Sequence, residues 1–277
     1  MNNDNKDNEL KRLEMLLARN MAQITAKILV LSNKGGVGKS SVAVNIAVCL
    51  SKKGAKVGLL DADMHGPSVA KMLGFEGKRL PAGENSISPY PVNPNLVAVS
   101  MASFLESVDT PVVWRGPLKM TALRQFLAEV NWGKLDYLVI DSPPGTGDEP
   151  LSVCQLVRDL TGAIIVTTPQ DIALLDSRKC VSFLRQLSVP ILGILENMSG
   201  LTCPHCGENI DIFKSGGGEK AAKELNIPFL GRIPFDMRIV ETTDDGKSYI
   251  ETYFDSEAAK VIEKICSSID GKVRSKH

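Results

Sequence analysis

A glycine- and lysine-rich segment, residues 34–41, carries the residue types needed to bind a polyphosphate. It reads Lys-Gly-Gly-Val-Gly-Lys-Ser-Ser and lies between an apolar run at 28–31 and a helix-like segment at 40–52. Glycines let backbone N–H groups turn toward phosphate oxygens, and a helix N-terminus adds partial positive charge there. A lysine followed by a hydroxyl residue can reach the β- and γ-phosphates and ligate Mg²⁺. The sequence therefore predicts a nucleotide site formed by Gly35, Gly36, Val37, Gly38, Lys39, Ser40 and Ser41, with Ser40 as the Mg²⁺ ligand.

Two further apolar runs end in acids that a nucleotide hydrolase could use. Residues 57–60 lead into Asp61-Ala-Asp63, and residues 137–140 lead into Asp141-Ser-Pro-Pro-Gly-Thr-Gly. Ligands of parallel α/β sheets bind at the carboxyl ends of the strands, so we expect these acids to lie near the phosphates. Strand termination or helix capping is the structural alternative for each, because aspartate favours both.

Cys203-Pro-His-Cys206 is a second candidate site, because two thiolates three residues apart can bind one metal. Two cysteines do not fill the four positions of a zinc ion or a [4Fe–4S] cluster, and the chain has no second Cys-x-x-Cys. A symmetric homodimer would supply four thiolates. The residues alone leave a bridging cluster and a structural zinc both open. The other cysteines, in apolar helical segments, are expected to pack as small hydrophobic side chains: Cys49, Cys154, Cys180 and Cys266.

Composition favours one sizeable α/β domain. The chain has 277 residues, of which 43% are hydrophobic, and no formal net charge. The neutral balance argues against a dedicated nucleic-acid surface, and no apolar run is long enough for a membrane span. A cytoplasmic protein with neither membrane nor nucleic acid as partner is therefore expected, with its cysteines as thiols or metal ligands.

Alternating short apolar runs and helical segments predict a predominantly parallel, doubly wound sheet with helices on both faces. We expect a tail and short helix over 1–22, one domain over 23–270 and a C-terminal tail over 271–277. The stretch 77–95 indicates an excursion from the core. Strands are predicted at Lys27–Ser32, Lys56–Asp61, Leu96–Met101, Tyr137–Asp141, Ala163–Thr168, Ile191–Asn197 and Phe229–Ile233. Helices are predicted at Leu118–Val130, Glu149–Asp159, Ile172–Leu187 and Gly217–Leu225.

The chain resembles the Mrp/ApbC/Nbp-type iron–sulfur cluster carriers, a branch of the P-loop ATPases that include MinD and ParA. The resemblance covers about residues 27 to 254. Its motifs occur in this order: the loop at 34–41, Asp61-Ala-Asp63, Trp114-Arg-Gly-Pro117, Asp141-Ser-Pro-Pro-Gly-Thr-Gly, Glu196-Asn-Met198 and Cys203-x-x-Cys206. Asn33 stands where such loops more often have glycine, and asparagine tolerates left-handed backbone geometry better than most residues.

The resemblance implies a homodimeric ATPase that uses ATP and Mg²⁺, holds a [4Fe–4S] cluster between subunits and passes it to apo-proteins. Aerobic preparations could hold zinc instead. By resemblance, Lys34 reaches the partner subunit's nucleotide, Asp63 orients the attacking water and Asp61 lies nearer the metal. Asp141 would hold Mg²⁺ through a water. The remaining implied contacts are Gly145 as a γ-phosphate donor and hinge, and Asn197 and Pro234 at the adenine.

Two other classes of protein share part of this pattern. A MinD- or ParA-like spatial switch with a structural zinc at the cysteine pair is the main alternative. However, the basic C-terminus, residues 270–277, lacks the bulky apolar residues of a membrane-binding helix. A reductase component resembling nitrogenase iron protein also bridges a cluster across a dimer, but its cysteines are widely separated in sequence.

Overall fold

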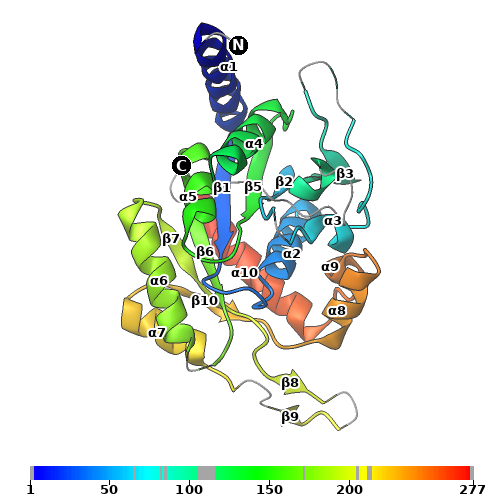
Figure 1. The fold of residues 1–277 in the computed structure, drawn as a ribbon. Helices are drawn as coiled ribbons and strands as arrows, with labels where there is room; N and C mark the ends of the chain where they lie inside the picture. Colours follow the sequence, from blue (N-terminus) through cyan, green and yellow to red (C-terminus); the bar gives the residue numbers. More distant parts are fainter. Residues whose placement is uncertain are drawn as a thin grey trace.

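An eight-stranded sheet forms the centre of the protein in this computed structural model (Figure 1). In spatial order the strands are β10 (Phe229–Arg232), β7 (Ile191–Glu196), β6 (Gly162–Thr167), β1 (Ile24–Leu31), β5 (Leu135–Asp141), β2 (Val57–Asp61), β4 (Leu96–Ser100) and β3 (Tyr90–Asn93). All neighbours pair in parallel except β3 with β4. The structure describes residues 3–64, 66–81, 83, 86–104, 116–170, 172–203, 206–210 and 214–274.

Helices cover both faces of the sheet, and each face has its own hydrophobic cluster. One face carries α2 (Lys39–Lys52), α3 (Val69–Met72), α8 (Met237–Asp244), α9 (Tyr249–Thr252) and α10 (Glu257–Arg274). The other carries α1 (Asn3–Ala22), α4 (Gly116–Glu129), α5 (Asp148–Leu156), α6 (Ala173–Gln186) and α7 (Gly217–Leu225). Strand residues such as Leu138 and Ile140 are fully buried, as expected of parallel strands covered on both sides. The predicted doubly wound α/β fold is confirmed.

The predicted strands all occur, and the differences lie at the edges and ends of the fold. The excursion at 77–95 contains the antiparallel edge strand β3. A 3₁₀ turn, Met101–Phe104, follows β4, and a small hairpin formed by β8 (Leu201–Thr202) and β9 (Asn209–Ile210) follows β7. Helix α10 continues through residues 271–274, which we had expected to belong to a tail, because Val273 packs into the core. Helix α1 likewise begins at Asn3, within the expected N-terminal tail.

Some predicted features lie outside the described residues. They are the ends of the chain at 1–2 and 275–277, Trp114 and Arg115 of one family motif, and the two residues between the paired cysteines, Pro204 and His205. Among the helices that the structure describes, none combines the length and apolar character needed to cross a lipid bilayer.

Candidate functional site

The loop between β1 and α2 has the backbone geometry that its glycines predict. Gly36 and Gly38 have φ angles of 79° and 78°, in the left-handed region, and Gly38 is the N-cap of α2. Lys39 opens the helix, and its side chain is 7% exposed. The N-terminus of α2 therefore points its free N–H groups and its partial positive charge at the carboxyl edge of the sheet.

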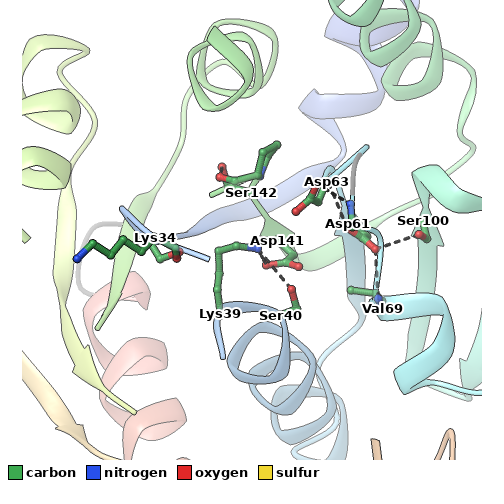
Figure 2. Close-up of polar contacts among 12 residues, drawn as sticks. Lys34, Lys39, Ser40, Asp61, Asp63, Val69, Ser100, Asp141 and Ser142 are labelled. Atoms are coloured by element: carbon green, nitrogen blue, oxygen red, sulfur yellow. Dashed lines mark hydrogen bonds and ion pairs between the residues drawn. The ribbon is translucent and has the colours of Figure 1, made fainter. Parts of the chain in front are cut away.

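Lys39 forms a buried ion pair with the acid at the end of β5. Its Nζ lies 2.5 Å from Asp141 Oδ1 and 3.4 Å from Ser40 Oγ (Figure 2). Asp141 is fully buried, and its Oδ2 accepts no hydrogen bond from the described residues. A buried carboxylate oxygen without a donor, beside a serine hydroxyl, is a suitable set of oxygen ligands for Mg²⁺. The residues present therefore fit the metal that the sequence predicts.

A cavity of about 260 Å³ lies over this loop. Its lining brings together most of the phosphate-binding residues predicted from sequence, and its members come from the loop, from the segment after β2 and from the loop after β5. They are Ser32, Lys34, Gly35, Gly36, Gly38, Lys39, Ser40, Ser41, Asp63, Gly66, Ser68, Met72 and Pro144.

The two acids after β2 have different environments. Asp61 is fully buried and accepts hydrogen bonds from Ser100 Oγ at 2.9 Å and from Val69 N at 3.2 Å (Figure 2). Burial and the nearby Asp141 carboxylate raise the pKa of Asp61 to about 7. Asp63 lines the phosphate cavity and accepts a hydrogen bond from Gly66 N at 3.1 Å. Asp63 is thus the acid of the pair that borders the cavity.

Lys34 lines the same cavity but takes no part in the Lys39–Asp141 pair, because its ammonium forms an ion pair with Asp176, in the first turn of α6. Its Nζ lies 3.0 Å from Asp176 Oδ2, and Figure 2 shows its side chain directed away from Lys39 and Asp141. Asn33 Nδ2 donates to Asp176 Oδ1 at 2.8 Å. Asn33 is not among the residues with a left-handed backbone, so its position does not call on the tolerance of asparagine for that geometry. The asparagine instead supplies a side-chain amide to the carboxylate that holds Lys34.

The loop after β5 is tied to the end of β1. Gly145 has a φ of 97°, and its N–H donates to Ser32 O at 2.7 Å. Ser142 N donates to Val30 O at 3.1 Å. The Gly145 amide, predicted to contact the γ-phosphate, thus has an internal acceptor here. It would have to leave that acceptor to bind phosphate.

A second cavity, of about 240 Å³, continues from the phosphate cavity and is suited to a base. The two cavities share Gly38, Ser41 and Met72 in their linings. Asn197 Nδ2 donates to Val37 O at 3.0 Å, which places the predicted adenine contact directly against the loop. The rest of the lining is mostly apolar, as a planar ring requires: Met198, Pro234, Phe235, Asp236, Ile239, Val240, Thr243 and Asp244.

The paired cysteines lie at the end of the β8–β9 hairpin, which projects from the sheet at the end opposite α1 (Figure 1). Cys203 N donates to Glu208 O at 2.8 Å, and Gly207 N donates to Cys203 O at 2.9 Å. Cys203 is half-buried and Cys206 is exposed. Within the described part of a single chain, no group of three or more His, Cys, Asp or Glu side chains is arranged to hold a metal ion.

The other four cysteines lie in helices, as predicted. Cys49, Cys180 and Cys266 are buried, and Cys154 is half-buried. Burial raises the pKa of Cys154 to about 11 and that of Cys180 to about 12. These two thiols therefore stay protonated near neutral pH and are poor metal ligands.

Comparison with known proteins identifies the family. A model described as the NUBPL iron-transfer P-loop NTPase, of the ParA group, matches residues 23–270. The chain belongs to this family. The iron-sulfur cluster carrier protein of Methanocaldococcus jannaschii is 47% identical to it over 265 residues, covering 95% of this chain and 91% of that protein. The cytosolic Fe-S cluster assembly factor NUBP2 homolog of Trichoplax adhaerens is 46% identical over 247 residues, covering 88% and 93%.

Solved structures agree with this assignment. A nucleotide-binding protein of Archaeoglobus fulgidus, in complex with ADP, superposes with a TM-score of 0.75 at 35% identity, covering 85% of this chain and 92% of that one. The septum site-determining protein MinD of Pyrococcus horikoshii, complexed with Mg-ADP, gives a TM-score of 0.67 at 24% identity, with 91% and 98% covered. The second likeness shows that the fold is shared between this NTPase family and MinD.

Two acids beside this site, outside the linings of both cavities, have roles that were not predicted from sequence. Asp176 lies 143 positions from Asn33, and nothing in its local pattern marks it as a partner of the phosphate loop. Glu196 belongs to the Glu-Asn-Met motif, but only its neighbour Asn197 was given a role. A charged residue at the end of an otherwise apolar strand was the available signal, because a buried carboxylate needs donors.

Proposed function

We propose that this chain is an ATP-hydrolysing carrier that holds a [4Fe–4S] cluster between two subunits and transfers it to apo iron–sulfur proteins. The observation that carries the proposal is the cysteine pair on a projecting hairpin of a nucleotide-binding fold. Curated relatives named iron-sulfur cluster carrier proteins, with identities up to 47%, support it.

The cluster requires a dimer on this proposal. One chain offers two thiolates, Cys203 and Cys206, whereas a [4Fe–4S] cluster takes four. A twofold axis beside the hairpin would bring two pairs together. The partial exposure of the pair suits a cargo that must leave for another protein. The same dimer would let Lys34 of one subunit approach the nucleotide of the other.

Hydrolysis would rely on charge stabilisation and positioning. Lys39 and the loop N–H groups neutralise charge on the β- and γ-phosphates, and Asp63 orients the attacking water. Ser40 and Asp141 would hold Mg²⁺, Asp141 through a water and with Asp61 nearby, and the metal would supply positive charge that stabilises the reacting phosphates. Lys34 adds positive charge only when two subunits meet. Turnover would therefore be slow and dimer-dependent.

Adenine would occupy the cavity beside the loop. Its edge faces the Asn197 amide, and Pro234 and Phe235 supply apolar contact. Lipid or DNA binding with a structural zinc at the cysteines is the alternative function. What favours this alternative is the fold that the chain shares with MinD.

The test is anaerobic reconstitution of the full chain with iron and sulfide, followed by metal analysis and transfer to an apo iron–sulfur enzyme. We expect the protein to activate that enzyme faster than free iron and sulfide do. Cys203→Ala or Cys206→Ala should lose the cluster and keep nucleotide affinity, and Lys39→Ala should do the reverse. Zinc without iron after anaerobic purification, or activation no faster than with free iron and sulfide, would contradict the carrier function.

A further inference from the structure

The segment that carries both cysteines has two ends that lie together beside β7. It leaves the sheet at residues 198–200 and returns at residues 214–216, just before α7. We call these two ends the neck of the cysteine loop. Ser199 and Gly216, one from each end, bond to the same carboxylate oxygen of Glu196. Any change in that carboxylate therefore acts on both ends at once.

Glu196 is fully buried and accepts several hydrogen bonds. Its Oε1 accepts from Ser199 Oγ at 2.5 Å and from Gly216 N at 3.0 Å, and its Oε2 accepts from Gly218 N at 2.6 Å. Arg232 Nε lies 3.4 Å from Oε1. Charge-assisted bonds of this kind are stronger than neutral ones, and a buried charge left without donors is costly. The carboxylate thus fixes the neck rather than merely filling space.

The glycines at 216–218 permit the close approach of this segment to Glu196. A Cβ on Gly217 would lie 2.3 Å from Pro169 O, and a Cβ on Gly218 would lie 3.0 Å from Glu196 Cβ. Gly216 has a φ of 91°, which side chains rarely adopt. The run lets the start of α7 approach the end of β7 closely enough for two of its N–H groups to reach Glu196.

Asn197, the residue after Glu196, links the neck to the nucleotide loop. Asn197 Nδ2 donates to Val37 O at 3.0 Å, and a Cβ on Gly38 would lie 2.2 Å from that same Nδ2. Met198, between Asn197 and the neck residue Ser199, has a φ of 58°, an uncommon conformation for its type. A shift of the loop at Val37 would therefore reach the neck through two consecutive, tightly held residues.

We propose that Glu196 is a positioning residue that closes the neck of the cysteine loop, and that Asn197 makes the geometry of that neck depend on the nucleotide loop. Nucleotide binding and metal binding at the cysteines are then coupled through the end of β7, and the coupling is reciprocal. This inference rests on the proposed function in one respect, the binding of metal by Cys203 and Cys206.

The test measures Co²⁺ binding to the full chain by thiolate-to-cobalt absorption, without oxygen, with and without a magnesium complex of a non-hydrolysable ATP analogue. We expect the analogue to change the Co²⁺ affinity of the wild type about fivefold or more. Glu196→Gln should weaken Co²⁺ binding about tenfold, because the amide NH₂ must face either the Gly218 N–H or the Gly216 N–H, a donor against a donor. It should also abolish the effect of the analogue while leaving affinity for the analogue nearly intact.

Glu219→Gln is the matched control. Glu219 also pairs with Arg232 and lies in the first turn of α7, but its side chain is exposed. It should behave as the wild type. Ser199→Ala removes only the hydrogen bond from Ser199 to Glu196, so it should show a smaller loss of Co²⁺ affinity and of coupling. It replaces Glu196→Gln as the test variant if Glu196→Gln does not fold.

The outcomes separate the inference from the proposed function. Three results would overturn the inference. The first is unchanged coupling in Glu196→Gln or, if that variant does not fold, in Ser199→Ala. The others are an equal loss of Co²⁺ affinity in Glu219→Gln and the absence of coupling in the wild type. Co²⁺ absorption that survives in Cys203→Ser/Cys206→Ser would instead overturn metal binding by the pair, and the proposed function with it.

Discussion

Replacing Asp176 with asparagine should strengthen nucleotide-dependent dimerisation. In the structure Lys34 is held by Asp176 of its own chain, at 3.0 Å. On the proposed role, Lys34 must leave that partner to reach the nucleotide of a second subunit. Asparagine removes the ion pair but can still accept the Asn33 amide hydrogen bond. The variant therefore changes the cost of releasing Lys34 with little change to the local structure.

The expected magnitude follows from the exposure of the pair. The Lys34 side chain is 46% exposed and that of Asp176 is 16% exposed, so the pair is partly screened by solvent. Such a pair stabilises the resting state by about 1 kcal/mol, at the upper end of measured surface values. Two pairs break for each dimer, which makes about 2 kcal/mol and a roughly 30-fold lower dimer dissociation constant.

Sedimentation equilibrium with a magnesium complex of a non-hydrolysable ATP analogue would measure this constant. Glu224→Gln is the matched control. Glu224, on α7, pairs with Arg178, which lies on the same helix as Asp176, and this pair is away from the nucleotide loop. In a Lys34→Ala background the Asp176 substitution should have no effect. Dimerisation that is unchanged or weaker in Asp176→Asn, or an equal gain in the Lys34→Ala background, would refute the reasoning.

Two further substitutions test the loop and the buried acid. Gly38→Ala should lower nucleotide affinity in calorimetry by about 30-fold, because its Cβ would lie 2.2 Å from Asn197 Nδ2 at a φ of 78° and the Asn197–Val37 bond would break. Gly54→Ala, with a φ of 91° and open space for the Cβ, should lose stability without losing affinity, and equal affinity losses in both would contradict the idea. Because the pKa of Asp61 is raised from 3.8 to about 7, the native state retains a proton that the unfolded chain has lost. Without magnesium, the free energy of unfolding should therefore fall by about 3 kcal/mol as pH rises from about 4 to 7. In denaturant unfolding, Asp61→Asn should not show that fall. Parallel pH profiles of the free energy of unfolding for the two proteins would contradict the assignment of the proton to Asp61.

The central sheet was predictable because buried parallel strands leave short apolar runs in the sequence. The edge strand β3 was not, since it includes Pro91, is only partly buried and lies in a stretch with little periodicity. Helix α10 was given no bounds, although Ile262, Ile265 and Ile269 recur at helical spacing and are buried.

The local parts of the candidate site were predictable for a similar reason. The phosphate loop and the two strand-end acids each depend on neighbours within a few residues, so their patterns are visible in the chain. The roles of Asp176 and Glu196 depend on contacts with distant segments, Asn33 in one case and Gly216 in the other. Such pairings are set by packing, which no local pattern records.

In the structure, groups expected to bind the nucleotide are paired with other groups of the chain, and these internal pairs affect nucleotide binding. Lys39 pairs with Asp141, the Gly145 amide with Ser32 and the Asn197 amide with Val37. Nucleotide binding exchanges these partners, so its net free energy is smaller than the new contacts suggest. If Lys39 turned to a phosphate alone, the buried Asp141 would keep an uncompensated charge. A nucleotide that arrives with its divalent cation avoids that cost, so the buried ion pair itself favours the metal complex over the free nucleotide.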